Sequence, residues 1–289
     1  MKVSCIILNY NDSTTTEKLV QLIKDYDELD SIVLVDNCST DNSATVLERL
    51  EGGKVHFIPA DRNGGYGYGN NLGIRYAYER LQATHVLVAN PDVEVSQECI
   101  RALMKTFQQV EGCGVAAPMT KGPDGKTQLS SWKLMGLAGD LLDTGIITRR
   151  LFKRWLTDRP LVVDSGVSYV DAVPGSLFMA DCAVLMDCGL YDENVFLYYE
   201  EKILGFKLRS KGYKTVLLQN QSYIHHHSVS IDKNVKSILK KQALLHESKL
   251  YYYIHYLKIN RLQVWLTKAF LGFLMGEIWF LTEILGMTW

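Results

Sequence analysis

Four short apolar segments in the first hundred residues each end abruptly in polar residues, and this pattern constrains the fold most. The segments are residues 3–8, 31–35, 55–58 and 86–88. Short apolar runs of this kind are typical of strands buried on both faces of a sheet. Helical spacing of apolar residues separates them, over residues 13–26, 42–50 and from the end of a glycine-rich segment through 81. This alternation predicts an α/β fold with a doubly wound, mostly parallel sheet.

Composition narrows the class of protein. The 289 residues are 47% hydrophobic and 22% charged, which is typical of a globular protein with a sizeable core. The net charge of −1 provides no global basic field, so we expect no nucleic-acid partner. The apolar stretch after Met1-Lys2 is too short for a signal peptide, and the six cysteines form no Cys-x-x-Cys pair. We therefore expect reduced thiols in a cytosolic protein.

The fourth apolar segment stops at Asn90-Pro91-Asp92. Pro91 cannot continue a central strand because it has no N–H to donate. Asp92 is therefore expected just beyond the carboxyl end of a core strand, where open α/β sheets bind their ligands. A carboxylate at that edge can hold a divalent metal against phosphate oxygens. The alternative interpretation is an ordinary turn, since Asn-Pro-Asp is also good turn chemistry.

A glycine-rich segment spans residues 63–73. Its glycines permit close backbone approach, and its end is expected to open a helix whose N-terminal N–H groups favour phosphate. It is not a P-loop, because no Gly-Lys-Ser/Thr follows. It is not a dinucleotide fingerprint either, because it follows the third strand rather than the first. A plain glycine loop is the alternative.

Three carboxylates elsewhere are candidates for the same site. Asp36 ends the second apolar segment, where it can accept a hydrogen bond from a ribose hydroxyl or a base, or else serve a turn or helix cap. Glu200 and Glu201 follow an aromatic-rich stretch. Apolar surroundings and a neighbouring like charge both raise a carboxyl pKa, which suits a general base. The alternative for this pair is an acidic helix start favoured by the helix dipole.

Three consecutive histidines follow the apolar-polar stretch 215–224. On a strand, alternate side chains share a face, so His225 and His227 would point the same way. Neutral imidazole ligates metal well, which makes both residues candidate metal ligands. A surface histidine cluster is the alternative. A structural zinc site is not expected, because no cysteine pair accompanies the histidines.

The middle and the end of the chain lack the strand–helix alternation. Residues 121–168 contain a turn at Gly122–Gly125 and a basic-aromatic stretch at 149–155, and we expect a mobile loop or lid there. Residues 235–289 are expected to be mainly helical.

The segment 262–289 is rich in Leu, Phe, Trp and Ile, but Glu277 lies in its middle and disfavours a membrane-spanning helix. An amphipathic helix in the bilayer interface is favoured, anchored by tryptophans. Nearby positive charges would attract anionic lipid: Lys236, Lys240, Lys241, Lys249, Lys258, Arg261 and Lys268. Contact with a second subunit, as in a homodimer, is the alternative.

Taken together, nine motifs in order along residues 1–230 resemble the family 2 glycosyltransferases. The matching segments are residues 9–11, 35–41, 63–73, 90–92, 175–179, 189–193, 198–201, 212–214 and 225–230. The likeness is greatest to the bacterial branch of rhamnosyl- and capsular polysaccharide-type enzymes. It implies the GT-A fold, a Rossmann-like doubly wound sheet, to which the residues after 230 would add a helical C-terminal extension.

The resemblance also implies roles for individual residues. It assigns nucleotide-sugar binding to seven residues: Asn9, Asp36, Ser39, Asn63, Gly64, Asn71 and Asn90. Asp92 matches the last position of the family's Asp-x-Asp metal motif, with Asn90 in place of its first Asp. His225 or His227 would complete a Mg²⁺ or Mn²⁺ site. Glu201 stands where the family usually has an Asp base, and Glu200 is the second choice. Ile203 replaces a further Asp that the family often has.

The resulting hypothesis is an inverting glycosyltransferase that moves a sugar from a UDP- or dTDP-sugar to a glycan or lipid-linked acceptor in surface polysaccharide synthesis. Residues 1–230 would form the catalytic domain, with donor binding in 1–115 and the acceptor side in 116–230. Residues 231–289 would form an amphipathic helical extension. The protein would be cytoplasmic and peripheral at the inner face of a bacterial membrane. Two alternatives are a non-catalytic sugar-nucleotide-binding scaffold and a sugar-nucleotide pyrophosphorylase.

Overall fold

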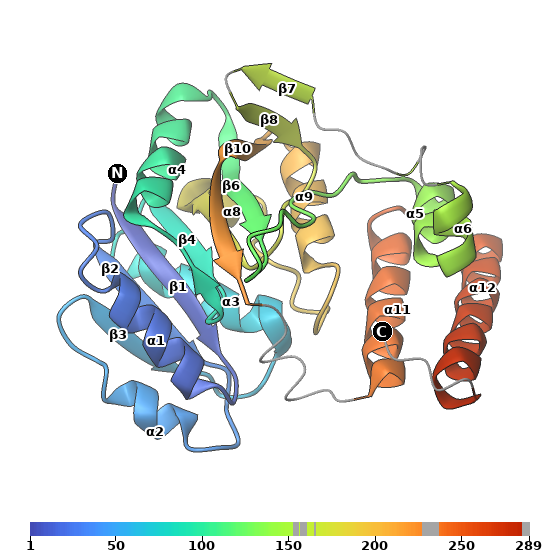
Figure 1. Ribbon diagram of the computed structural model, residues 1–289, viewed down its shortest axis with the longest axis horizontal. Coiled ribbons are helices and arrows are strands. Elements are labelled where there is room, and N and C mark those ends of the chain that lie inside the picture. The colour runs from blue at the N-terminus through green and yellow to red at the C-terminus, as the bar shows by residue number, and fades with distance from the viewer. Residues whose placement is uncertain (153–155, 157–160, 165, 227–236, 285–289) are drawn as a thin grey trace.

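The computed structural model describes residues 1–152, 156, 161–164, 166–226 and 237–284 (Figure 1). Within that part of the chain, ten strands form one sheet with helices on both faces. Two short helices and a helical hairpin lie beside this body, on the side of helix α9 (Glu200–Ser210) (Figure 1).

The strands and helices follow the chain in this order. The strands are β1 Val3–Asn9, β2 Ser31–Asp36, β3 Val55–Pro59, β4 His85–Ala89, β5 Val93–Glu94, β6 Cys113–Lys121, β7 Leu161–Asp164, β8 Val167–Val170, β9 Leu177–Asp181 and β10 Lys214–His225. The other helices are α1 Ser13–Ile23, α2 Ser43–Glu48, α3 Gly65–Glu79, α4 Gln97–Gln109, α5 Leu137–Thr144, α6 Ile146–Leu151, α8 Cys182–Asp187, α11 Ile238–His255 and α12 Arg261–Trp279.

The sheet order is β3-β2-β1-β4-β9-β6-β10-β8-β7, with β5 paired to β10. The first four strands are parallel, as the alternation predicts. Beyond β4 the sheet is mixed, because β6 and β10 pair in parallel, whereas β9 lies antiparallel between β4 and β6 and β8 lies antiparallel to β10. A parallel neighbour requires a crossover helix packed on the sheet. The helices that precede β9, α5 and α6, lie beside the sheet instead (Figure 1).

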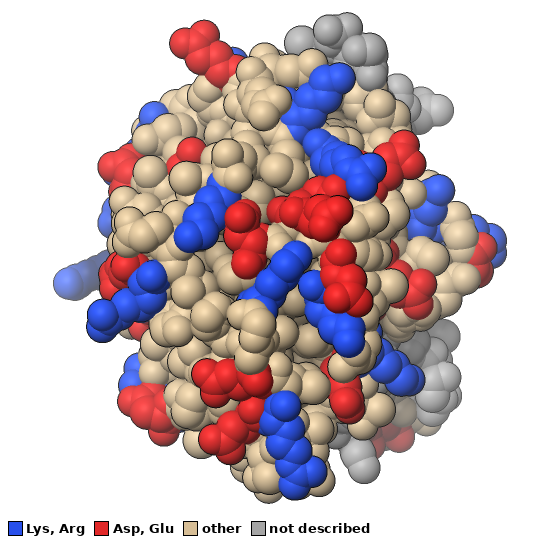
Figure 2. All heavy atoms as spheres, turned by 90° about the vertical axis from the view of Figure 1, so that its left-hand side faces the viewer, with Lys and Arg blue, Asp and Glu red and all other residues tan. Residues whose placement is uncertain are grey.

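Alternation along the strands fills two layers of core. In β1, Cys5 and Ile7 face α1 and α4, whereas Ile6 faces α3, and all three are fully buried. The central strands are apolar on both faces because helices cover both. On the side of the molecule where the sheet ends at β3, basic and acidic side chains are interspersed without a patch of one sign (Figure 2).

The glycine-rich segment is helical rather than a loop, since α3 begins at Gly65. The expectation that the helix starts only after Gly73 is therefore wrong. The glycines let the helix approach the sheet closely. A Cβ on Gly69 would lie 2.3 Å from Leu8 Cδ1, and a Cβ on Gly73 would lie 2.5 Å from Ile6 Cγ2. Within the segment, only Gly65 has a left-handed backbone, with φ +90°. A Cβ at this position would also clash with the backbone of Phe196.

The middle segment is more ordered than a loop or lid, because it contains α5, α6, β7 and β8. The turn at Gly122–Gly125 is confirmed by the Gly125 N–H···O=C Gly122 hydrogen bond of 2.9 Å. Lys153, Arg154 and Trp155 of the basic-aromatic stretch lie outside the described residues.

The helical prediction for the end of the chain is confirmed over residues 238–255 and 261–284, where α12 continues into a π-helical turn, Phe280–Ile284. By length and composition, Arg261–Ile284 is one helix of the described chain that could cross a membrane. Lys249 does not belong with the surface charges, because it is only 6% exposed and packs inward. Lys236 lies outside the described residues.

Candidate functional site

Asp92 lies in the turn between β4 and β5, at the carboxyl end of the parallel strands. The short strand β5 pairs antiparallel with β10, which aligns Val93 with His225. The Asp92 carbonyl also accepts from the backbone N–H of His226 at 2.9 Å. These contacts bring the Asp92 carboxylate, 7% exposed, to 3.3 Å from His225 Nε2. The structure thus joins two residues that lie far apart in the sequence.

A buried hydroxyl network lies beside this pair. The Tyr223 hydroxyl is within 2.5 Å of Ser176 Oγ and 3.0 Å of Thr120 Oγ1. Burial raises the pKa of Tyr223 to about 12, so its hydroxyl stays protonated near neutral pH. The network fixes the end of β10 immediately before His225.

The described side chains at this edge could bind a divalent cation only if substrate oxygens completed its coordination. No group of three His, Cys, Asp or Glu side chains that could hold a metal occurs among the described residues. Mg²⁺ is commonly held by one or two carboxylates, with substrate phosphates and water completing its shell. Asp92 would supply the carboxylate of that set, and His225 would add an imidazole nitrogen, which also ligates metals. His227, the other predicted ligand, lies outside the described residues.

The segment Gly175–Ser176 joins the two halves of the site. The Ser176 carbonyl accepts from the Asn90 N–H at 2.8 Å, and the Gly175 N–H donates to Glu201 Oε1 at 3.4 Å. The Tyr66 hydroxyl, from the first turn of α3, donates to the Gly175 carbonyl at 2.7 Å. The strand end that carries Asp92, the start of α3 and the start of α9 therefore meet at one place.

Glu200 and Glu201 occupy the first turn of α9 but differ in access. Glu200 is 6% exposed, and one of its carboxylate oxygens is buried without a hydrogen-bond partner. Burial, together with the neighbouring Glu201, raises the pKa of Glu200 well above 4.5. Glu201 is half-buried, and burial raises its pKa as well, although backbone donors including Gly175 oppose the shift. The acidic helix start is therefore confirmed, and both carboxyl groups have a raised pKa; a role as general base stays a prediction.

The first group of predicted donor residues forms a hydrogen-bonded unit at the ends of β1 and β2. Asn9 is fully buried; its amide donates to Asp36 at 2.8 Å and its oxygen accepts from Thr16 at 2.9 Å. Asp36 is 2% exposed and accepts from both the hydroxyl and the N–H of Ser39. The turn interpretation of Asp36 therefore describes its contacts within the chain, and half-buried Ser39 is the most accessible of the three.

The second group of predicted donor residues lies around α3. Asn71 is fully buried and bonds the backbone of Tyr191 from both ends of its amide. Asn63 accepts from the Asn37 amide at 3.0 Å. Asn63, Gly64 and Asn90 are half-buried at the edge of the site. Asn71 thus supports the loop before α9, whereas the other three residues can reach a ligand.

Sequence reasoning did not single out Tyr66, Gly175 and Ser176 as site residues. Tyr66 was part of the glycine-rich motif, and Gly175-Ser176 precedes an apolar run that is now β9. A polar Gly-Ser step directly before a buried strand was the available signal. What it could not show is that this strand enters antiparallel, which places its start, rather than its end, at the ligand-binding edge.

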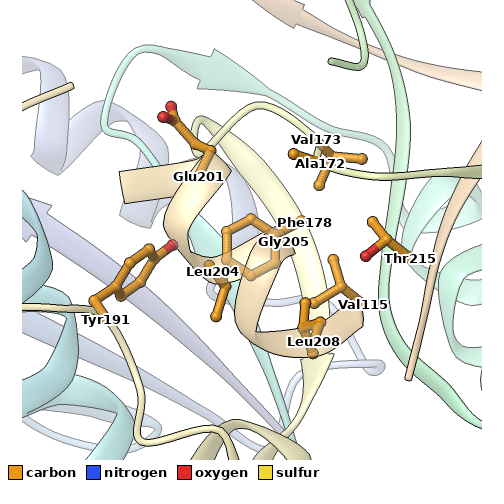
Figure 3. Close-up of a pocket in the computed structure, with 10 residues that line it drawn as sticks. All are labelled: Val115, Ala172, Val173, Phe178, Tyr191, Glu201, Leu204, Gly205, Leu208 and Thr215. Atoms are coloured by element: carbon orange, nitrogen blue, oxygen red, sulfur yellow. The ribbon is translucent and has the colours of Figure 1, made fainter. Parts of the chain in front are cut away.

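A small pocket lies beside α9, between that helix and the sheet. Its lining is mainly apolar: Val115, Ala172, Val173, Phe178, Tyr191, Glu201, Leu204, Gly205, Leu208 and Thr215 (Figure 3). Glu201 lies at its rim, and its carboxylate points away from the other lining side chains (Figure 3). The pocket is a gap in helix–sheet packing, and the carboxylate faces the Gly175 side instead.

Comparisons with known proteins give a matching family model, similar sequences and similar structures. Residues 4–163 match the family model described as glycosyl transferase family 2. The low-salt glycan biosynthesis hexosyltransferase Agl10 of Haloferax volcanii is 28% identical over 78% of this chain and 68% of its own length. The N-acetylglucosaminyl-diphospho-decaprenol L-rhamnosyltransferase of Mycobacterium tuberculosis is 26% identical over 72% of this chain and 70% of its own.

Solved structures show the same fold at low sequence identity. GalNAc-T7 with UDP, GalNAc and Mn²⁺ is 15% identical with a TM-score of 0.59, over 88% of this chain and 50% of that one. The mannosyltransferase PcManGT of Pyrobaculum calidifontis, in complex with GDP-Man and Mn²⁺, is 13% identical with a TM-score of 0.59, over 93% and 69% of the two chains.

Proposed function

Because the chain belongs to glycosyl transferase family 2, we propose that it moves a sugar from a nucleotide-diphosphate donor to an acceptor hydroxyl with inversion at the anomeric carbon. UDP- and dTDP-sugars are the proposed donors. A glycan or lipid-linked acceptor in surface polysaccharide synthesis is supported by the diphospho-decaprenol in the name of one relative.

The observation that carries the proposal is the meeting of three elements at Gly175–Ser176. Gly175 contacts the carboxylate of Glu201, which is half-buried and has a raised pKa. The next residue, Ser176, contacts the strand end that precedes Asp92. A donor whose diphosphate lies at Asp92 would then present its sugar toward Glu201. One base is enough, because a direct displacement forms no glycosyl-enzyme intermediate.

In the proposed mechanism Glu201 takes the proton from the acceptor hydroxyl as the acceptor oxygen bonds to the anomeric carbon. The bond from that carbon to the diphosphate oxygen breaks, and the diphosphate leaves with the electron pair. When bound by Asp92 and His225, Mg²⁺ or Mn²⁺ would supply positive charge against the leaving group. The raised pKa of Glu201 makes it a stronger base once it is ionised.

The residues proposed for donor binding fall into two groups that differ in solvent exposure. Ser39, Asn63, Gly64 and Asn90 are half-buried and are proposed to touch the nucleotide or the sugar. Asn9, Asp36 and Asn71 are buried with their polar atoms engaged, and they are proposed to hold the donor loops in shape.

The C-terminal helices are proposed to place the enzyme at the cytoplasmic surface of a membrane. Large exposed apolar residues concentrate on α12 and the turn after it: Leu262, Trp265, Leu266, Phe273, Trp279, Phe280 and Ile284. Residues 1–230 would then be the catalytic domain and residues 231–289 an extension lying against lipid. A homodimer through the same face is the alternative outcome of its test.

The proposed function is tested with a thermal-shift screen of UDP, dTDP and GDP with and without Mn²⁺, followed by turnover assays. A ligand that binds only the folded state raises the melting temperature. We expect a metal-dependent shift with one nucleoside diphosphate, and turnover of its sugar conjugate. Binding without turnover across a panel of acceptors would indicate the non-catalytic scaffold. Formation of a sugar nucleotide from a nucleoside triphosphate and a sugar 1-phosphate, with release of pyrophosphate, would indicate the pyrophosphorylase.

A further inference from the structure

Helix α11 contacts the segment before α9 at several points. Tyr251 and Tyr256 both donate to Asp192 Oδ2, at 3.0 Å and 2.6 Å. Ser248 donates to the Leu197 carbonyl at 2.7 Å. Helix α11 and the residue that follows it therefore form hydrogen bonds with both the start and the later part of the loop that leads to Glu200 and Glu201.

The end of that loop has an unusual backbone. Tyr198 and Tyr199 both have φ +69°, so two consecutive residues with side chains adopt the left-handed region immediately before Glu200. Such conformations persist only where the surroundings hold them, and they cluster at functional sites. A contact that fixes Tyr199 therefore also fixes the direction in which α9 starts.

Asp140 of α5 provides that contact. It is 1% exposed and accepts from the hydroxyl of Tyr199, the ammonium of Lys202 and, at 2.6 Å, the hydroxyl of Tyr253 on α11. Tyr199 and Lys202 flank the two glutamates in sequence. Burial alone would raise the pKa of Asp140, but the ammonium groups of Lys202 and Lys249 hold it below its ordinary value. Asp140 is therefore an ionised, buried acceptor shared by both sides of the candidate base.

We propose that α11 and Asp140 are positioning elements for the catalytic base, with Tyr253 holding Asp140, and Asp140 holding Tyr199 and Lys202 so that Glu201 faces Gly175. This inference rests on the proposed function of Glu201. It gives the C-terminal extension a role in turnover that is separate from any role at a membrane.

The matched test is Tyr253→Phe against Tyr252→Phe. The two tyrosines are neighbours on α11 and both are buried, at 0% and 1% exposure. The Tyr253 hydroxyl bonds Asp140, whereas the Tyr252 hydroxyl is buried without a partner, so each substitution removes the same atom and only one breaks the network. We expect Tyr253→Phe to lower kcat about tenfold, the scale of a small misplacement of a reacting group, with the donor KM within about twofold of wild type. Tyr252→Phe should leave both parameters near wild type.

A second variant addresses folding. Asp140→Asn should lower kcat further, and melting temperatures of all three variants show which of them fold. A lower melting temperature for Tyr253→Phe with kcat unchanged would mean that the network is only structural and would overturn the inference. Equal losses in Tyr252→Phe and Tyr253→Phe would overturn it as well. A wild-type enzyme that turns over no donor would instead overturn the proposed function, and the inference with it.

Discussion

At the scale of single residues, the pair Glu200 and Glu201 shows how neighbours in the sequence acquire different environments. Successive side chains on a helix project about 100° apart, since the helix has 3.6 residues per turn. One glutamate of the pair is therefore directed into the protein while the other borders the site. Glu200 is almost fully buried with an unpartnered oxygen, whereas Glu201 is half-buried and bonded to Gly175.

Glu201→Gln should retain donor binding and lose turnover by about 10²-fold or more, the scale of general-base catalysis. The amide keeps the size of the side chain but cannot take a proton from the acceptor. Donor affinity measured by calorimetry, beside kcat from nucleotide release, separates the two effects. Wild-type turnover in this variant would remove Glu201 from the mechanism.

Glu200→Gln should change stability in a pH-dependent way. The folded pKa of Glu200 is raised above the ordinary 4.5, so its stability contribution is fully present below that value and is lost as the pH rises through the folded pKa. The variant lacks this titration. The difference in melting temperature, variant minus wild type, should therefore be larger at pH 8 than at pH 4.5. A difference that does not vary with pH would show that Glu200 keeps an ordinary pKa.

At the scale of elements, the sequence predicts where the glycine-rich motif lies but not its secondary structure, since the motif forms the start of helix α3 instead of a loop. Its glycines are needed for packing against β1 and β2 rather than for a flexible loop. At Gly73 a Cβ would meet Ile6 Cγ2 at 2.5 Å and Val35 Cγ2 at 3.1 Å. Both neighbours are fully buried β-branched residues of the central sheet, which have little freedom to move.

Gly73→Ala and Gly272→Ala should therefore change stability in opposite directions. Both glycines are helical, but a Cβ added to Gly272 on α12 would meet nothing within 4 Å. Overpacking at Gly73 should cost about 1–3 kcal/mol, whereas Gly272→Ala should gain up to about 1 kcal/mol from helix propensity. Urea unfolding of both variants measures the difference. Equal effects would contradict the packing role of the α3 glycines.

The same scale shows what the sequence could and could not predict. The first four strands and the polar residues at their ends were predictable, because short apolar runs and turn residues are local signals. The antiparallel entry of β9 was not, since it depends on where the α5–β8 segment packs. The site followed the same division: Asp92 and Glu201 came from local patterns and motif resemblance, but their link through Gly175 is a long-range contact that no local pattern encodes.

At the scale of the whole molecule, the C-terminal hairpin has an inner and an outer surface. Its inner surface contacts the loop before α9, while the outer surface of α12 exposes Trp265 and Phe273 at 66% and 71%. An exposed apolar surface of this extent is typical of a binding face. The exposure also means that these side chains can be replaced with little loss of core packing.

Replacing Trp265 and Phe273 together by Gln should reduce co-sedimentation with anionic vesicles without changing nucleotide binding. Leu129→Gln is the control, because Leu129 is 57% exposed but lies outside the helical hairpin. Binding should also weaken with salt if basic side chains contribute, since exposed charges are screened within about 10 Å at 0.1 M ionic strength. If neither the wild type nor the variant sediments, but the variant has half the wild-type mass by light scattering, the face is a dimer contact.

The most direct measurement of the central claim is metal-dependent nucleotide release by wild type and Asp92→Asn, with their melting temperatures as a control for folding. Asp92 is at a turn beside His225, so the variant should keep its fold. We predict that the wild type releases nucleoside diphosphate from its sugar donor in Mn²⁺ or Mg²⁺ and not in chelator, and that a folded Asp92→Asn protein does so in neither. Undiminished release by Asp92→Asn, with the same dependence on metal as wild type, would contradict the claim.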